Sequence, residues 1–271
     1  MKPRPFDYVQ PETAEEAVAL LADYGDEARI LAGGQSLVPM LNLRLIEPAV
    51  LIDISRLAAF GAIHDHGDYI EIGAAVTQNT LLAWRELKLK LPLLAAALPF
   101  VGHFQTRNKG TVCGSIAHAD PSAELPLALA VLGGAVVLRS KRGERVVAAE
   151  AFQQDMLTTA REPDELVAAV RFPAIEGKGV AFNEVARRHG DFAMVAVAAI
   201  ADRRGAVMLG VGGMAGRPMV RAVDGDAAGA VREWAEELEG YEDLHASAAL
   251  RRDLLCNLAP RVIEEAKQCA A

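Results

Sequence analysis

Two adjacent glycines follow a short apolar run near the beginning of the chain, and this arrangement can bind an anion. The segment reads Leu31, Ala32, Gly33, Gly34, Gln35, Ser36 and Leu37. Glycine lets the backbone approach a ligand closely and adopt positive φ, and successive N–H groups in such a turn make an anion-binding concavity. Ser36 adds a hydroxyl donor. Taken alone, however, the segment is explained more simply as a tight turn between a strand and a helix.

A second polar segment, residues 111–126, offers the same kind of groups. Thr111 and Ser115 supply hydroxyls, and Gly114 leaves the backbone N–H groups accessible to a ligand. We expect a helix to begin after this segment, at Pro121-Ser122. Such groups suit a contact with a diphosphate. Two segments of this kind, far apart in the sequence, predict one extended ligand that bridges two lobes of the protein.

The titratable and nucleophilic residues of the second segment have more than one explanation. Glu124 can accept hydrogen bonds from ribitol or ribose hydroxyls, but helix capping and the helix dipole explain Asp120 and Glu124 when each is taken singly. A histidine such as His118 ordinarily titrates near neutrality, yet no nucleophile with an orienting acid can be paired with it from the spacing. We therefore expect His118 to donate a hydrogen bond to a ligand or to be a packed polar residue, and Cys113 to be a buried free thiol.

The run from Arg187 to Ala193 contains two arginines, a Gly-Asp turn and Phe192. The simplest interpretation is a strand with a basic, solvated end, in which Phe192 belongs to the core. An aromatic ring at such a turn can instead stack on a flavin, which from chemistry alone is the less frequent case. The common phosphate-binding patterns are absent from the sequence, since there is no G-x-x-x-x-G-K-[ST] and no G-x-G-x-x-G after a strand.

The composition is that of an ordinary globular protein with an acidic balance. Apolar residues make up 52% and charged residues 24% of the 271 residues, a length that fits about two domains. The net charge, 28 − 36 = −8, argues against a nucleic-acid binder, which carries a basic face. We expect no transmembrane segment, because no run of about 18 uncharged apolar residues occurs. A cytoplasmic location is expected, because no apolar signal core follows the first residues.

The three cysteines, Cys113, Cys256 and Cys269, are far apart and form no Cys-x-x-Cys pair. A disulfide framework is therefore not expected. An iron–sulfur cluster usually takes four cysteine ligands, so this chain cannot supply one alone. Any such cluster must lie on another chain, and we predict no metal site in this one.

The elements that position these segments are predicted from apolar periodicity and turn residues. Before residue 173, strands are predicted at 6–9, 29–32, 50–54, 69–75, 135–138 and 166–170. Helices are predicted at 87–98, at 125–132, after Thr13 in a capping box, and after Thr77, which can cap the helix that follows it. The stretch 105–115 shows no period, and 173–179 is expected to be the main domain boundary. Beyond it, an antiparallel meander at 180–187, 194–202 and 207–214 is followed by helices at 227–238 and 246–267. Pro260 is expected to bend or split the last helix.

Taken together and in this order, these segments resemble the medium, flavoprotein subunits of the xanthine dehydrogenase and carbon monoxide dehydrogenase family of molybdenum hydroxylases. Members carry A-G-G-[HQ]-S-L, then T-[IV]-G-G-[NS] followed by A-D-P-x-x-[DE]-L-P, and then R-R-x-G-D-[YF]-A. The corresponding residues here are 32–37, 111–115, 119–126 and 187–193. The resemblance covers nearly the whole chain. Two positions depart from it: Cys113 replaces the first glycine of the Gly-Gly pair, and Phe192 replaces the more common tyrosine.

The resemblance implies an α+β fold and a flavin cofactor. A two-lobed FAD-binding domain of the vanillyl-alcohol-oxidase type would have its lobes at residues 1–57 and 58–174, and a small C-terminal α+β domain with an antiparallel sheet would occupy 178–271. The two glycine segments would hold the diphosphate of FAD, Glu124 would be its acidic ligand, and Phe192 would lie beside the isoalloxazine. The implied FAD-binding residues are Leu31, Ala32, Gly33, Gly34, Gln35, Ser36, Leu37, Val101, Thr111, Gly114, Ser115, His118, Glu124 and Phe192.

The resemblance also implies a division of labour between subunits. A large molybdopterin subunit would hydroxylate the substrate, and a small iron–sulfur subunit would pass electrons to FAD in this chain and on to an external acceptor, in a heterotrimer or its dimer. The protein would position the cofactor and tune it, with no catalytic residue of its own for the organic substrate. Two alternatives are a stand-alone flavin oxidoreductase of the same fold superfamily and a non-enzymatic assembly or binding module.

Overall fold

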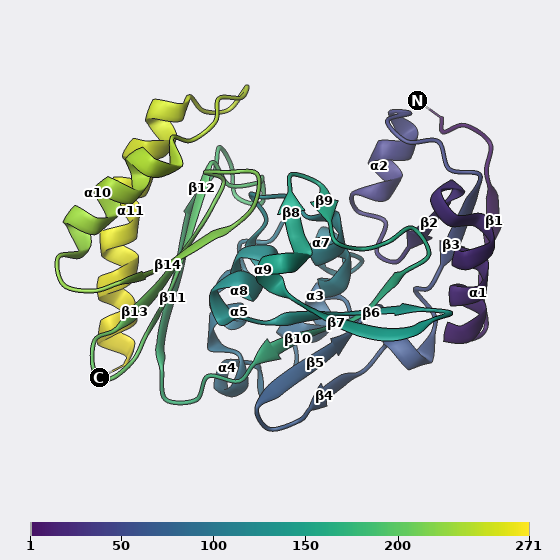
Figure 1. Ribbon diagram of the computed structural model, residues 1–271, viewed down its shortest axis with the longest axis horizontal. Coiled ribbons are helices and arrows are strands. Elements are labelled where there is room, and N and C mark those ends of the chain that lie inside the picture. Colours follow the sequence, from purple (N-terminus) through teal and green to yellow (C-terminus); the bar gives the residue numbers. More distant parts are fainter. Residues whose placement is uncertain (1, 271) are drawn as a thin grey trace.

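The computed structural model describes residues 2–270, which form an elongated molecule with its two ends far apart (Figure 1). Three main sheets follow one another along the chain, with three, five and four strands, and a two-stranded ribbon lies beside them. Helices and mostly antiparallel strands are combined in this way, so the α+β class predicted from the sequence is confirmed.

The first sheet is parallel and carries one long helix. Its strands β1 (Asp7–Val9), β2 (Ala28–Leu31) and β3 (Val50–Asp53) lie in the order β1-β3-β2. The helix α1 (Ala14–Tyr24) begins at the predicted capping residue, where the Thr13 hydroxyl accepts a hydrogen bond from the Glu16 N–H at 3.1 Å.

One helix of this part was not among the elements predicted from apolar periodicity, although the interpretation of the glycine pair as a turn implied a helix after it. The helix α2 (Leu37–Asn42) follows the glycine pair after two intervening residues and precedes β3. Its six residues are too few to show a helical period.

The second sheet is antiparallel and has the strand order β4-β5-β10-β6-β7. Its strands are β4 (Ile63–Asp65), β5 (Tyr69–Gly73), β6 (Ala135–Ser140), β7 (Gly143–Ala148) and β10 (Leu166–Pro173). The ribbon consists of β8 (Gln153–Asp155) and β9 (Thr158–Thr159). Of these strands, β5, β6 and β10 were expected from the sequence. The edge strands β4 and β7 were not, because both are largely exposed and have no apolar alternation.

Short helices lie between the strands of this part of the chain. The helix η1 (Gly25–Glu27) precedes β2, and η2 (Ala58–Phe60) precedes β4. Between β5 and β6 lie α3 (Gln78–Leu82), α4 (Leu87–Lys90), α5 (Pro92–Ala97), α6 (Phe104–Arg107), α7 (Val112–His118) and α8 (Glu124–Leu132), and α9 (Ala149–Phe152) follows β7. The single helix expected at 87–98 is therefore wrong. Pro92 disfavours helical dihedrals at the residue before it, and Leu91 has φ −131° and ψ 58°, so the chain forms two helices there.

Two further expectations about this region are corrected. The aperiodic stretch 105–115 contains most of α6 and the start of α7, which are too short to show a period. The helix expected to begin at Pro121-Ser122 begins at Glu124, because the Asp120 carboxylate accepts a hydrogen bond from the Ser122 N–H at 2.8 Å and holds this stretch as a turn.

The third sheet is the antiparallel meander predicted from the sequence, with one additional strand. Its strands are β11 (Gly179–Val185), β12 (Val195–Ala201), β13 (Val207–Gly212) and β14 (Met219–Val223). The helices α10 (Ala227–Leu238) and α11 (Ala248–Cys269) cover its outer face (Figure 1). The helix α11 continues through Pro260 rather than splitting there, since it is held by a buried apolar stripe that packs on β11 and β12.

Both faces of the third sheet are buried, which ties the C-terminal part to the rest. Alternate residues of β12 belong to different cores: Ala196 and Ala198 lie in the core that includes α8, whereas Val195 and Val197 lie in the core that includes α11. The same apolar core that lies under α8 also reaches the first two sheets. The third sheet is therefore packed directly against α8, whose first residue borders the cavity described below.

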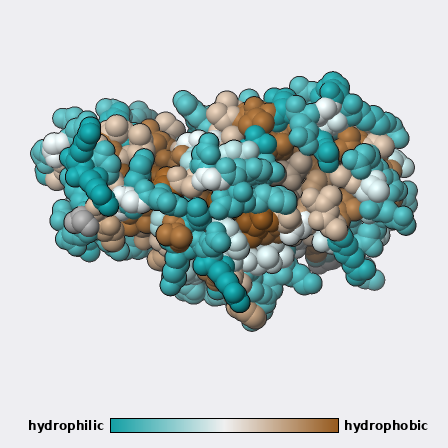
Figure 2. All heavy atoms as spheres, turned by 90° about the horizontal axis from the view of Figure 1, so that it is seen from below, coloured by the Kyte–Doolittle hydropathy of each residue, from teal (hydrophilic) through white to brown (hydrophobic). Residues whose placement is uncertain are grey.

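The face seen from below is mostly hydrophilic, with hydrophobic atoms in small scattered groups (Figure 2). Across residues 2–270, none of the helices combines the length and the apolar character that crossing a bilayer requires.

Candidate functional site

A cavity of about 610 Å³ gathers the segments that the sequence singled out. Its walls come from β2 and the following loop, from α7 and the turn before α8, and from the loop that carries Phe192. All of the FAD-binding residues expected from the resemblance line it except Leu31. Leu31 faces a smaller pocket behind the glycine loop, which it shares with Val38 and Pro39.

The glycine loop is built so that its backbone faces the cavity. Gly34 has φ +70°, and a Cβ on Gly33 would overlap the carbonyl oxygen of Lys109 and lie 2.7 Å from Gly110 Cα. Only glycine can therefore occupy position 33 beside the second segment. The amide N–H groups of residues 33–36 donate no hydrogen bond within residues 2–270. They remain available to an anion in the cavity.

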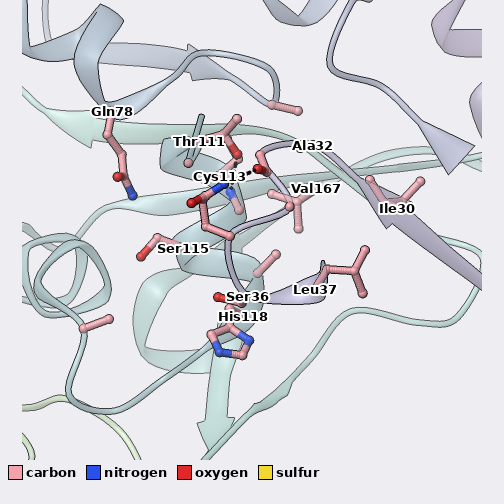
Figure 3. A pocket seen from close by; sticks show the side chains of 18 of the residues that line it. Ile30, Ala32, Ser36, Leu37, Gln78, Thr111, Cys113, Ser115, His118 and Val167 are labelled. Carbon is pink, nitrogen blue, oxygen red and sulfur yellow. Dashed lines mark hydrogen bonds between the residues drawn. The ribbon is translucent and has the colours of Figure 1, made fainter. Parts of the chain in front are cut away.

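The second segment presents a helix start rather than an open loop. Thr111 caps α7, because its hydroxyl accepts a hydrogen bond from the Gly114 N–H at 3.0 Å. The Gly114 N–H is therefore already occupied within the chain. The Ser115 hydroxyl lies at the cavity, and His118 and Ser36 lie together at another side of it (Figure 3).

Cys113, which departs from the family pattern, is one of the residues that line the cavity, and its thiol is buried. Its Sγ donates a hydrogen bond to the Ile72 carbonyl oxygen at 3.3 Å, and burial raises the pKa of the thiol. The free, buried thiol expected from the sequence is confirmed. The helical backbone of α7 accommodates this side chain by directing it into the core.

Glu124 is the first residue of α8, and its side chain is only 4% exposed. Burial raises the pKa of this carboxyl to about 7, and the charge of Asp120 adds to the rise while Arg107 opposes it. Burial also disfavours the charged form of His118, and it therefore lowers the pKa of that imidazole. A carboxyl group in this state holds a proton near neutrality and can donate a hydrogen bond as well as accept one.

A second carboxyl group, that of Glu184, lies close to Glu124. Glu184 is two residues from Phe182 on β11, so both side chains point to the sheet face that packs on α5 and α8. Its Oε2 is buried and has no hydrogen-bond partner within residues 2–270. Burial, followed by the charge of Glu124, raises the pKa of Glu184 to about 8. No sequence pattern indicated this pairing.

Phe192 is not a core residue. Its side chain is 56% exposed and borders the cavity, so the simplest interpretation of the sequence is wrong at this position. The loop before it packs against another turn: a Cβ on Gly190 would lie 3.0 Å from the backbone of Gly102. That turn is held by Arg107, whose guanidinium donates to the carbonyl oxygens of Val101 and Gly102 at 2.8 and 3.0 Å. Val101 and Phe192 are thus brought to the same part of the cavity.

Several lining residues were missed by the sequence analysis. They include Arg29, Ile30, Gln78, Thr106, Arg161 and Val167. Ile30 and Val167 belong to predicted strands, and their position at a cavity depends on how two sheets meet. Gln78 follows the predicted capping residue Thr77, and a polar residue at a helix start has no distinguishing signal by itself.

These features fit an extended ligand that carries phosphates. A side chain larger than that of glycine at position 33 would fill the space beside the glycine loop, and the N–H groups of residues 33–36 are free within residues 2–270. The buried side-chain oxygen of Gln78, Oε1, also lacks a hydrogen-bond donor within residues 2–270. The cavity also has the size and the mixture of apolar and polar walls typical of cofactor sites.

Comparison with known proteins assigns the family. The family model described as the FAD binding domain in molybdopterin dehydrogenase matches residues 4–175. The chain belongs to this family. It is therefore a FAD-binding medium subunit of the molybdenum hydroxylase type, and its cofactor is FAD.

Relatives with named activities cover most or nearly all of the chain. The 6-hydroxypseudooxynicotine dehydrogenase complex subunit alpha of Paenarthrobacter nicotinovorans is 36% identical over 98% of this chain and 96% of its own length. The carbon monoxide dehydrogenase medium chain of Hydrogenophaga pseudoflava is 36% identical over 76% of this chain and 72% of its own length. These relatives are dehydrogenase subunits, so the chain is part of an oxidoreductase.

Solved structures show the same fold. A chain of carbon monoxide dehydrogenase from Hydrogenophaga pseudoflava aligns with a TM-score of 0.94 at 31% identity, covering 100% of both chains. A chain of quinoline 2-oxidoreductase from Pseudomonas putida 86 aligns with a TM-score of 0.91 at 32% identity, covering 100% of this chain and 99% of that one. The match includes the third sheet, which lies beyond the family model.

Proposed function

We propose that this chain holds FAD in the cavity between the glycine loop, α7 and the Phe192 loop, and transfers electrons within a molybdenum hydroxylase. The observation that carries the proposal is the convergence of four separated sequence segments on one cavity. Bound FAD would supply the chemistry of accepting electrons singly and releasing them as a pair. The residues of this chain bind and orient it, and no residue is assigned to the organic substrate.

The proposed ligand contacts follow from the groups that face the cavity. The free N–H groups of residues 33–36 and the Ser36 hydroxyl would bind the diphosphate. Glu124 and His118 would contact the ribitol or a ribose, and Val101 and Phe192 would border the isoalloxazine. Thr111 would act mainly by capping α7, which supports Ser115 beside the same ligand. Leu31 would support the loop from behind.

We also propose the division into residues 1–57, 58–174 and 178–271. The three main sheets support it, because the first ends at Asp53, the second runs from Ile63 to Pro173, and the third begins at Gly179. Two lobes would enclose the ligand, and the third unit would bring Phe192 to it.

A complex with two partner subunits is proposed from the names of the relatives, which are chains of larger enzymes: a complex subunit alpha, a medium subunit and a medium chain. The partners would be a small iron–sulfur subunit and a large molybdopterin subunit, in a heterotrimer or its dimer located in the cytoplasm. Large apolar side chains that remain exposed, including Leu43, Leu45 and Phe104, are of the kind that such interfaces bury.

The test is the visible spectrum of the purified chain, with the flavin released and identified. We expect FAD at close to one per chain. A Gly33→Ala variant should lose it, because its Cβ would overlap the Lys109 carbonyl oxygen and block the glycine loop. The matched control is Gly61→Ala, whose Cβ would meet only the Ala58 carbonyl oxygen at 3.6 Å. A colourless wild-type chain that also fails to take up added FAD would refute the proposal.

A further inference from the structure

Gln78 is a buried amide that borders the cavity and lacks a partner. Its side chain is 5% exposed, and its Oε1 accepts no hydrogen bond from residues 2–270. A buried polar atom left without a partner costs about 1–3 kcal/mol, and native proteins leave few such atoms. Because Gln78 lines the cavity, a ligand bound there can supply the missing partner.

The position of Gln78 is set by the backbone rather than by chance packing. Its N–H donates to the Gly110 carbonyl oxygen at 2.8 Å, and the Val112 N–H donates to the Val76 carbonyl oxygen at 3.1 Å. These two bonds join the start of α3 to the segment that leads into α7. The carboxamide then lies beside Gly110, where a Cβ would come within 3.1 Å of Gln78 Oε1.

Gln78 lies at one end of the cavity. Figure 3 shows its side chain on the side opposite Ile30 and Val167. A series of close approaches leads from it toward Phe192: Gly110 lies beside the Thr106 carbonyl oxygen, and Thr106 borders Gly102, which packs against Gly190. Gly110 also lies directly against Gly33, so Gln78 is placed between the glycine loop and the turn that packs against the Phe192 loop.

The chemistry of a carboxamide restricts what it can pair with. It presents an N–H₂ donor and a C=O acceptor side by side, which matches a ligand edge where an N–H adjoins a carbonyl. In FAD, the isoalloxazine carries such an edge at N3–H, between two ring carbonyls. Adenine offers an amino group beside a ring nitrogen, but it lies at the other end of the molecule.

We infer that Gln78 binds the pyrimidine edge of the isoalloxazine, pairing with N3–H and an adjacent carbonyl. This inference rests on the proposed FAD site and goes beyond it, because none of the family motifs quoted above contains this residue. Gln78 would hold the isoalloxazine in one orientation beside Phe192, because the exposed Phe192 side chain cannot orient the ring through hydrogen bonds.

The experiment compares FAD with 3-methyl-FAD, in which a methyl group replaces the N3 hydrogen. Both are titrated into the flavin-free full chain. The wild type should bind FAD about tenfold more tightly, which corresponds to about 1.4 kcal/mol. Gln78→Met, which keeps the length of the side chain but cannot pair, should bind FAD about tenfold more weakly than the wild type and bind both flavins equally.

Gln153→Met is the matched control. Gln153 is also buried, its Nε2 donates to the Ala119 carbonyl oxygen at 2.8 Å, and it does not border the cavity. This variant should keep the wild-type preference for FAD. Gln78→Glu, of nearly the same shape, should bind FAD more weakly than the wild type, because its carboxylate would replace the amide donor that faces a ring carbonyl.

The outcomes separate this inference from the proposed function. Absence of FAD binding by the wild type would refute both. FAD binding with an unchanged preference in Gln78→Met, or wild-type affinity in Gln78→Glu, would refute only the role of Gln78. A parallel loss of affinity for ADP-ribose in Gln78→Met would also refute it, because that ligand has no isoalloxazine. Unchanged ADP-ribose binding, together with loss of the FAD preference, is the expected result.

Discussion

Glu124 and Glu184 are two acidic side chains buried in the same wall of the protein. Burial raises the pKa of Glu124 to about 7 and that of Glu184 to about 8, and the charge of Glu124 adds to the rise at Glu184. In the unfolded chain both groups would titrate near pH 4.3, as an ordinary glutamate does at about that value. Folding is therefore coupled to proton binding at this site.

The sign of the resulting pH dependence follows from proton counting. At pH values above about 4.3 and below about 8, the folded chain binds more protons than the unfolded chain. The contribution of these groups to stability is present at lower pH and is lost as the pH rises through that window. We expect these two groups to lower the urea midpoint of the flavin-free chain as the pH rises from about 5 to about 8.5, while His118, whose pKa is lowered by burial, acts in the opposite direction.

Glu124→Gln should make this decline smaller. The substitution removes one titrating group and also removes the charge that raises the pKa of Glu184. The control is Glu233→Gln, at an exposed position on α10, which should keep the slope of the wild type. If Glu124→Gln and the wild type lost stability equally with rising pH, the buried carboxyls would not be its source.

At the scale of elements, α8 connects the cavity to the third sheet. Glu124 lies at its start, while later residues of the helix pack on β12 and β13. The packing is close at Gly210, where a Cβ would overlap Val131 Cγ2 and lie 3.0 Å from Leu127 Cδ1. A glycine in the middle of a strand is here a consequence of the approach of a helix.

Gly210→Ala should destabilise the chain by roughly 1–3 kcal/mol, because the added methyl group overpacks this contact. Combining it with Val131→Ala makes room for that methyl group. The double variant should therefore lose less stability than the sum of the two single changes. Denaturant unfolding of all four proteins measures the coupling, and strictly additive losses would show that the helix and strand do not meet as described.

The two apolar cores are not separate at the scale of the whole molecule. The cavity takes its walls from the first sheet, the second sheet and the Phe192 loop of the third unit, and β12 shares its residues between the cores. A ligand bound there contacts all three parts. It should therefore stabilise the chain as one body rather than one lobe alone.

We expect FAD to raise the unfolding temperature of the whole chain in a single step. At a concentration about 100 times its Kd, a ligand adds about 2.7 kcal/mol of stability. Phe192→Ala should leave the flavin-free chain within about 0.5 kcal/mol of the wild type, as an exposed substitution does, and reduce the shift caused by FAD. Calorimetry of both proteins with and without FAD measures this. Two separate transitions in the presence of FAD, only one of them shifted, would contradict the expectation.

Local features of the fold were predictable because they depend on neighbours in the chain. Thr13 and Thr77 cap their helices as the sequence indicates, and the meander after residue 178 follows from strand-length apolar runs separated by turns. The failures were local as well: α6 and α7 are too short for a period, and Pro92 divides a run of apolar residues that otherwise suits one helix.

The sequence by itself determined which segments bear ligand-binding chemistry, since the glycine pair, the Thr111 segment and the Phe192 turn are all visible as patterns. Only the tertiary structure decided how they meet. The overlap that reserves position 33 for glycine involves Lys109, and the raised pKa of Glu184 depends on Glu124. Such contacts join residues far apart in the chain, and they are created by packing of sheets and helices rather than by local preference. The unpartnered amide of Gln78 is of the same kind: its type is written in the sequence, but its burial beside the cavity is a property of the folded chain.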